Sequence, residues 1–142
     1  MRELTEADKE TIYYSLVHMG VVGWNRSCIR MQYALEYVVQ HENLTDMQVI
    51  PMYVDIAKMD HCKWKAVERS LRYTINSIWE KQGLECSMLL YHSGTQVKRP
   101  SNSNFLFQYK EEYKKGNIQR WNDSVATPIL SGFQANEINR KT

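Results

Sequence analysis

Residues 53–83 carry the pattern that decides the expected fold, and they read YVDIAKMDHCKWKAVERSLRYTINSIWEKQG. A short helix is expected to end near Met59, because the polar residues 60–62 interrupt it. A longer helix follows over 63–82 and ends at Gly83, since glycine commonly terminates helices. Two helices joined by so short an interruption are typical of a helix-turn-helix motif. In that motif His61 stands where the turn usually has glycine, and the small Ala57 lets the two helices approach closely.

The longer helix has one apolar face and one charged face. The apolar residues recur at helical spacing and predict a buried side: Val67, Leu71, Ile75 and Ile78, with Trp79 beside them. The opposite face carries Lys65, Glu68, Arg69, Arg72 and Tyr73. In a helix-turn-helix the first turns of the second helix enter the major groove, where arginine pairs with guanine. The charged face of an ordinary helical hairpin has the same spacing, and this pattern leaves that alternative open.

Three helices are expected before residue 60, the last of them the short helix of the helix-turn-helix. Residues 5–8 resemble a capping sequence, and the first helix then runs to Gly20 with Ile12, Leu16 and Met19 at helical spacing. The second is expected over 27–40, with a stripe of Ile29, Tyr33 and Tyr37 that Met31, Leu35 and Val38 broaden. The third is expected over 47–58, capped by Thr45 or Asp46, with Pro51 in its first turn.

A second basic segment precedes the last expected helix. Lys98 and Arg99 lead into a helix that Ser101 or Asn102 can cap and that ends near Lys115 and Gly116. Exposed amides at a helix N-terminus, next to two cations, form a corner that suits a phosphate. A plain capped helix after a basic loop is the alternative.

The composition indicates one domain of ordinary globular character. The chain has 142 residues, of which 43% are hydrophobic and 24% charged. We expect a folded unit over 1–116 and a tail of uncertain structure over 117–142. The apolar runs of the chain are too short to cross a membrane, and its N-terminus is polar. The three cysteines do not form a disulfide pattern, so a cytoplasmic location is expected.

The charge is divided unevenly along the chain. Residues 1–56 carry a net charge of −4 and residues 57–142 one of +6. Any polyanion is therefore expected to meet the second half. No catalytic motif occurs, and the histidines and cysteines lack the paired spacing of a zinc site, so neither an enzyme nor a metal or other cofactor is expected.

Three blocks of the sequence resemble one known family. The first block comprises residues 54–58, the segments 67–69 and 71–72, and Trp79. The second block comprises residues 18–21 with the helix at 29–35. The third block is residues 99–106, which read RPSNSNFL. In this order and spacing they resemble the C-terminal DNA-binding domain of the sporulation stage-zero-A response regulator family. Together they span about residues 5–115.

The resemblance implies both a fold and a function. It implies an all-α domain of about six helices, winged-helix-like, with a helix-turn-helix and without extensive sheet. It also implies a regulator of transcription in sporulating Firmicutes that binds double-stranded promoter DNA through the helix 63–82. Other partners are RNA polymerase, which a segment around 82–91 would contact, and a second copy on tandem sites. The implied DNA contacts, with two nearby lysines, are Lys63, Lys65, Glu68, Arg69, Arg72, Tyr73, Arg99, Ser101 and Asn102.

Three departures from the family pattern qualify this expectation. Ala66 stands where the family usually has arginine, and Tyr73 stands where it usually has histidine. The loss of a guanine-reading arginine would change the preferred site, by about 1–3 kcal/mol at that base. The family's phosphate-receiving domain is also missing, so we expect a regulator without its own receiver. The alternative function is a protein-interaction module that kept the fold and lost specific DNA binding.

Overall fold

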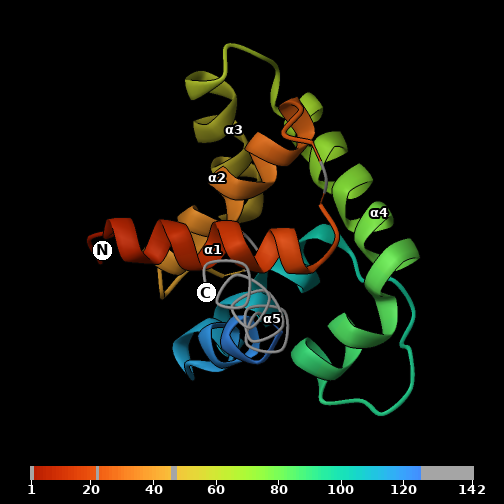
Figure 1. Ribbon diagram of the computed structural model, residues 1–142. Coiled ribbons are helices and arrows are strands. Elements are labelled where there is room, and N and C mark those ends of the chain that lie inside the picture. Colours follow the sequence, from red (N-terminus) through yellow and green to blue (C-terminus); the bar gives the residue numbers. More distant parts are fainter. Residues whose placement is uncertain (1, 22, 46–47, 126–142) are drawn as a thin grey trace, which may run out of the picture.

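A computed structural model describes residues 2–21, 23–45 and 48–125, which form an all-α fold (Figure 1). Its helices are α1 (Glu6–His18), α2 (Arg26–Gln40), α3 (Val49–Met59), α4 (Trp64–Tyr91) and α5 (Asn102–Lys114). A further helical stretch covers 117–125, and no strand occurs among the described residues. The expected all-α class is therefore confirmed. None of the helices in these ranges is long and apolar enough to span a bilayer.

Helix α1 begins and ends as its sequence predicts. The Asp8 N–H donates to the Thr5 hydroxyl, and the Thr5 N–H donates in return to the Asp8 carboxylate, which completes a capping box. At the other end Gly20 adopts φ +92°, a conformation that side chains rarely allow. The Gly20 and Val21 amides donate to the carbonyls of Val17 and Leu16, so the helix ends in a Schellman motif.

Helix α2 lies at the centre of the fold and packs against α1, α3, α4 and α5 (Figure 1). Its buried face is centred on Met31, Leu35 and Val38. The expected stripe of Ile29, Tyr33 and Tyr37 is only half-buried, so its place at the centre of the buried face was wrong. Tyr37 is not drawn fully into the core because its hydroxyl is polar. The hydroxyl remains near the surface and donates to the Asp55 carboxylate over 3.0 Å.

Helix α3 starts two residues later than expected. Its N-terminal residue is Val49, which leaves Pro51 in the first turn as predicted. The flanking Gln48 offers no side-chain cap to the helix; instead its side-chain oxygen accepts from the Thr45 N–H over 2.7 Å. Asp46, the other predicted cap, lies outside the described residues.

Helix α4 does not stop at Gly83, where the sequence pattern ends it. A kink at Gln82, with φ −137° and ψ 33°, separates its first part from residues 83–91. Gly83 is buried and does not adopt the positive φ of a terminating glycine. A side chain at Gly83 would collide with that of Gln96, so this glycine provides room for close packing. After the kink Cys86, Leu89 and Leu90 continue the core.

The folded part extends beyond residue 116, where we expected the tail to begin. Ser101 caps α5 by accepting from the Asn104 N–H over 3.2 Å, as predicted, and Gly116 follows α5 with φ +78°. In the helical stretch 117–125 Ile118 is fully buried, and Asn122 donates to the Thr11 carbonyl of α1 over 2.9 Å. Residues 126–142 of the expected tail lie outside the described residues.

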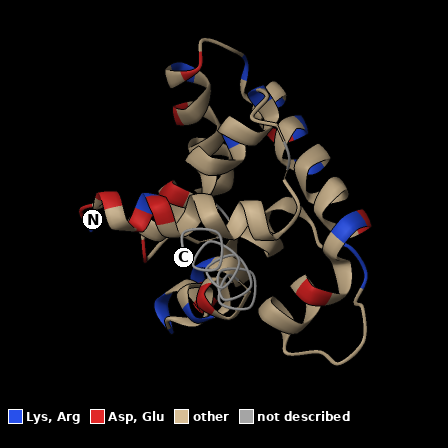
Figure 2. Cartoon of the chain, in the orientation of Figure 1, with Lys and Arg blue, Asp and Glu red and all other residues tan. Residues whose placement is uncertain are grey.

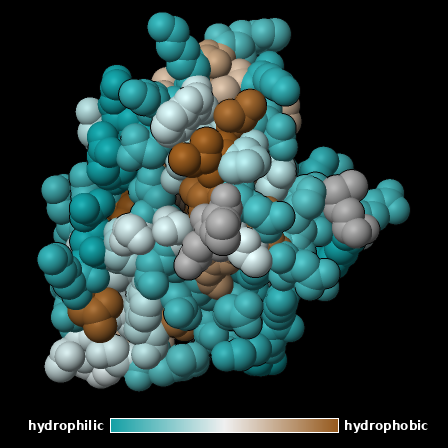
Figure 3. Space-filling model, turned by 180° about the vertical axis from the view of Figure 1, so that it is seen from behind, coloured by the Kyte–Doolittle hydropathy of each residue, from teal (hydrophilic) through white to brown (hydrophobic). Residues whose placement is uncertain are grey.

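Charged and apolar residues are unevenly spread over the surface. Figure 2 shows Asp and Glu at the N-terminal end of α1, whereas Lys and Arg recur along the first half of α4. The face seen in Figure 3 is mainly hydrophilic, with apolar surface in separate areas. The first half of α4 therefore offers positive charge to a partner.

A buried carboxylate ties the start of α1 to α5. The Asp8 carboxylate accepts from the Tyr113 hydroxyl over 2.5 Å, from the Thr5 N–H over 3.0 Å and from the Arg2 guanidinium over 3.0 Å. Burial by itself would raise the pKa of Asp8, but the hydrogen bonds from Tyr113 and Thr5 outweigh it and lower the pKa from 3.8 to about 2.

This contact predicts a component of acid sensitivity. Between about pH 4 and pH 2 the unfolded chain takes up a proton at Asp8 that the folded chain does not. The free energy of unfolding therefore decreases as the pH is lowered through this range. Urea unfolding at about pH 5 and about pH 3 should show a smaller fall for Asp8→Asn than for the unsubstituted chain. Glu6→Gln, at an exposed carboxylate of the same helix, is the control and should keep the full fall. An equal fall in Asp8→Asn would contradict this role.

Candidate nucleic-acid interface

The connection between α3 and α4 forms the turn of a helix-turn-helix. His61 adopts φ +53°, the left-handed conformation that explains why glycine suits this position. The Cys62 N–H donates to the carbonyl of Ala57 over 3.0 Å, and Ala57 is buried between the helices. Val67 is fully buried, as predicted. The turn therefore fixes where the N-terminus of α4 points.

An ion-pair network that the sequence analysis missed holds this turn on α2. The Asp60 carboxylate accepts from Arg26 over 2.8 Å and from Arg30 over 2.7 Å. Its side chain is only 7% exposed, and that of Arg30 is 14% exposed. The Arg30 guanidinium also donates to the Ser70 hydroxyl of α4 over 2.9 Å. Arg30 thus joins α2 to both ends of the turn, a contact over 40 residues of chain that no local pattern reveals.

The predicted face of α4 is turned outward. Lys63 precedes the helix as an exposed N-cap residue, and Lys65 lies over the Trp64 ring at 5.8 Å. Tyr73 is 56% exposed. Arg69 is exposed and has no ion pair or hydrogen-bond partner within the described part of the chain. Its guanidinium is therefore available to an external acceptor.

Two other residues of this face are paired with each other. The Arg72 guanidinium donates to the Glu68 carboxylate over 2.5 Å, and it lies 6.0 Å from the centre of the Tyr73 ring. Both side chains are partly exposed. The pair orients the two groups and reduces the positive charge of the face, because its carboxylate and guanidinium offset each other.

The predicted corner before α5 lies next to this pair. A hollow of about 330 Å³ is lined by residues from α3, from α4 and from the start of α5: Val49, Tyr53, Glu68, Arg72, Arg99, Ser101, Asn102 and Ser103. The structure thus brings five of the predicted site residues together, from two segments about 30 residues apart. Lys63, Lys65, Arg69 and Tyr73 do not line this hollow. They lie on the neighbouring outer surface of α4.

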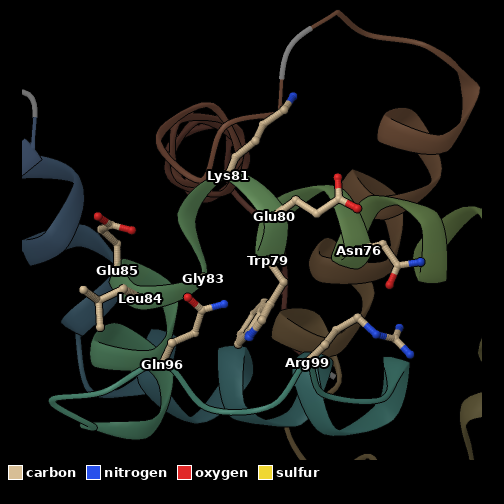
Figure 4. A pocket seen from close by; sticks show the side chains of 9 residues that line it. All are labelled: Asn76, Trp79, Glu80, Lys81, Gly83, Leu84, Glu85, Gln96 and Arg99. Atoms are coloured by element: carbon tan, nitrogen blue, oxygen red, sulfur yellow. The ribbon is translucent and has the colours of Figure 1, made fainter.

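Arg99 also borders a second hollow, of about 570 Å³, beside the kink in α4. Figure 4 shows Gln96, Trp79 and Arg99 following one another along it, with Lys81 pointing away. The Trp79 ring N–H donates to the Val97 carbonyl over 2.9 Å, which anchors the loop before α5 to the core. Arg99 is exposed and has no ion-pair or hydrogen-bond partner among the described residues, so its charge faces solvent between the two hollows.

Comparison with known proteins identifies the family. The family model of the sporulation initiation factor Spo0A C terminal matches residues 12–112, which is most of the chain. The chain belongs to this family. Searches of curated proteins and of solved structures gave no match. The match covers the helix-turn-helix, both hollows and most of α5.

The Spo0A C-terminal family consists of DNA-binding regulatory domains of sporulation and is not a family of enzymes. The exposed cations of α4 and the corner before α5 have the chemistry to bind a polyanion. Among the residues that the structure describes, no group of three or more His, Cys, Asp or Glu side chains could hold a metal ion.

The Asp60 network should control the stability of this Spo0A-type helix-turn-helix. Asp60→Ala leaves the Arg30 charge in a site with little solvent, and we expect a loss of about 3 kcal/mol in the free energy of unfolding. Asp55→Ala removes an exposed carboxylate of α3 that accepts a hydrogen bond from Tyr37, and should cost about 1 kcal/mol or less. Chemical denaturation measures both. Equal losses would show that Asp60 does not stabilise the motif more than an ordinary surface acid.

Proposed function

We propose that this chain is a sequence-specific regulator of transcription that inserts the first turns of α4 into the major groove of promoter DNA. The observation that carries the proposal is the outward guanidinium of Arg69, on the second helix of a helix-turn-helix, which no described residue pairs with. Arginine in this position can donate two hydrogen bonds to guanine. The family supports the general activity, and the outward position of the side chain supports the assignment of Arg69 to base contact.

The ion pair of Glu68 and Arg72 prepares two further groups for base or phosphate contact. A carboxylate held at the groove can accept from the amino group of cytosine, and an arginine can donate to guanine or to a phosphate. Because the two side chains already orient each other over 2.5 Å, less conformational entropy is lost on binding. Tyr73, exposed next to Arg72, offers an apolar ring and a hydroxyl at the edge of the same surface.

The corner before α5 serves the phosphate backbone. Ser101 satisfies the Asn104 amide with its hydroxyl and the Phe105 amide with its carbonyl. The amides of Asn102 and Ser103, in the first turn, have no acceptor among the described residues. Two free amides at the positive end of a helix, next to the Arg99 guanidinium, suit a phosphate. Lys63 and Lys65 extend the cationic surface along the DNA backbone without reading its sequence.

A contact with RNA polymerase remains a prediction for the second part of α4. After the kink Leu84 and Met88, one turn apart, are 41% and 53% exposed although they are apolar. Such a pair suits a protein partner better than DNA. Association of two copies on tandem sites also remains a prediction.

Selection of bound sequences from a random duplex library, at two salt concentrations, tests the proposed function. Enrichment of a short motif, with affinity that falls steeply as salt rises, is the expected result, because several phosphates are contacted at once. The motif should depart from that of relatives with arginine and histidine at positions 66 and 73. Weak, salt-sensitive binding without enrichment would contradict the proposal and favour the protein-interaction module.

Replacement of Arg69 tests its assignment as a base-reading residue. Arg69→Ala should weaken binding to the selected site by about 1–3 kcal/mol and relax the preference at one base pair. The free energy of unfolding should change by no more than about 0.5 kcal/mol, since the side chain is exposed and has no partner among the residues that the structure describes. Arg120→Ala, at an exposed arginine of the stretch 117–125, is a matched control that should leave the affinity unchanged. Comparable losses of affinity and stability in Arg69→Ala would point to a structural role.

A further inference from the structure

The first part of α4, which we call the recognition helix, lies far in the sequence from Arg99 and the start of α5, which we call the phosphate corner. One side chain joins the two. The Asn102 amide nitrogen donates to the backbone carbonyl of Glu68 over 2.9 Å. It also donates to the Tyr53 hydroxyl over 3.2 Å. Asn102 is the first residue of α5, directly after the Ser101 cap. The start of α5 is thereby bonded to α4 and to α3 at the same atom.

The direction of these bonds follows from their partners. A backbone carbonyl only accepts, so the NH₂ group of Asn102 must be the one that faces Glu68. This group has two hydrogens, and the two bonds use both. No side-chain donor of Asn102 is left for a phosphate. The side chain of Asn102 is therefore committed to the fold, and only its backbone amide remains for a phosphate.

The bond to Tyr53 carries the connection further along α4. The Tyr53 ring is 4% exposed and stacks on the Trp64 ring, with their planes 4° apart and their centres separated by 6.4 Å. Trp64 is the first residue of α4. Asn102 thus supports the recognition helix at two levels: directly at Glu68, and through Tyr53 at the N-terminus.

We propose that Asn102 is a positioning residue that fixes the phosphate corner relative to the recognition helix, so that both engage one DNA duplex as a single unit. The inference rests on the proposed function. Arg99 and the start of α5 line the same hollow as Glu68 and Arg72 of α4, and Asn102 lines it with them. A fixed spacing between them lowers the entropic cost of binding, because the second contact needs no further ordering once the first is made.

A double-mutant cycle on the selected duplex measures this coupling. Arg69→Ala removes a base contact and Arg99→Ala removes a phosphate contact. In the otherwise unsubstituted chain, each single variant raises the dissociation constant by a certain factor. The double variant should raise it by a factor about threefold or more below the product of the two single factors. In the Asn102→Ala background the two losses should multiply. Asn102→Ala by itself should lower specific affinity about threefold or more, because the start of α5 and α4 must then be ordered relative to each other on binding.

Two further variants separate positioning from stability. Asn104→Ala changes the same residue type in the same turn, where its side chain accepts from the Tyr91 hydroxyl, and it should leave the coupling intact. Tyr53→Phe removes only the hydroxyl and keeps the ring on Trp64, so it should reduce the coupling in part. Circular dichroism establishes that each variant is folded at the temperature of the binding assay. Tyr53→Phe gives the same test if Asn102→Ala does not fold.

Each possible outcome decides between the explanations. Coupling that persists in both Asn102→Ala and Tyr53→Phe would overturn the inference while the proposed function stands. Persistent coupling with a weaker affinity and an unchanged salt slope in Asn102→Ala would show a direct contact of the uncharged side chain with the DNA instead. Independent losses in the unsubstituted chain would show that the two surfaces do not act as one unit. If the unsubstituted chain selects no sequence, the proposed function fails and the positioning role falls with it.

Discussion

The Asp60 carboxylate, held between Arg26 and Arg30, sets the position of the helix on which the function of this chain depends. Asp60 lies in the turn after α3, and both arginines belong to the central helix α2. Arg30 in addition donates to Ser70 on α4. Since α2 packs against four other helices, a charge network anchored on it relates the turn to the whole core. The angle at which α4 leaves the turn is thereby determined by α2.

Helix α4 is held in place by α5 as well as by α2. Arg30 holds α4 from one neighbouring helix, and Asn102 holds it from another, at Ser70 and Glu68 respectively. These contacts involve groups with little access to solvent, where hydrogen bonds of charged or polar partners are most costly to lose. Arg69, in contrast, has no partner in the described residues. The first part of α4 is therefore firmly bonded on its inner side and free on its outer side, as a DNA-reading helix requires.

The sequence predicted those features that depend on neighbouring residues. The capping box at Thr5, the cap at Ser101 and the early Pro51 are all present, because each needs partners within a few positions. Local patterns failed at Gly83, where the glycine serves close packing against Gln96 rather than the end of a helix. They also failed on α2, where the tyrosine stripe stays at the edge of the buried face because the hydroxyl groups need polar surroundings.

By itself the sequence determined the helix-turn-helix pattern and the set of charged residues on the outer face of α4, since periodicity encodes these directly. Its resemblance to a known family, in three blocks, indicated the family. Only the tertiary structure decided which of these residues are paired. It places Arg72 against Glu68, leaves Arg69 unpaired among the described residues, and turns the Asn102 amide inward to α4 and α3. It also adds Arg30 and Asp60, which no motif indicates. The physical reason is that a hydrogen bond depends on distance in space. The Glu68–Arg72 pair is local, four residues apart on one helix, but the partners of Arg30 at Asp60 and of Asn102 at Tyr53 lie 30 and 49 residues away along the chain.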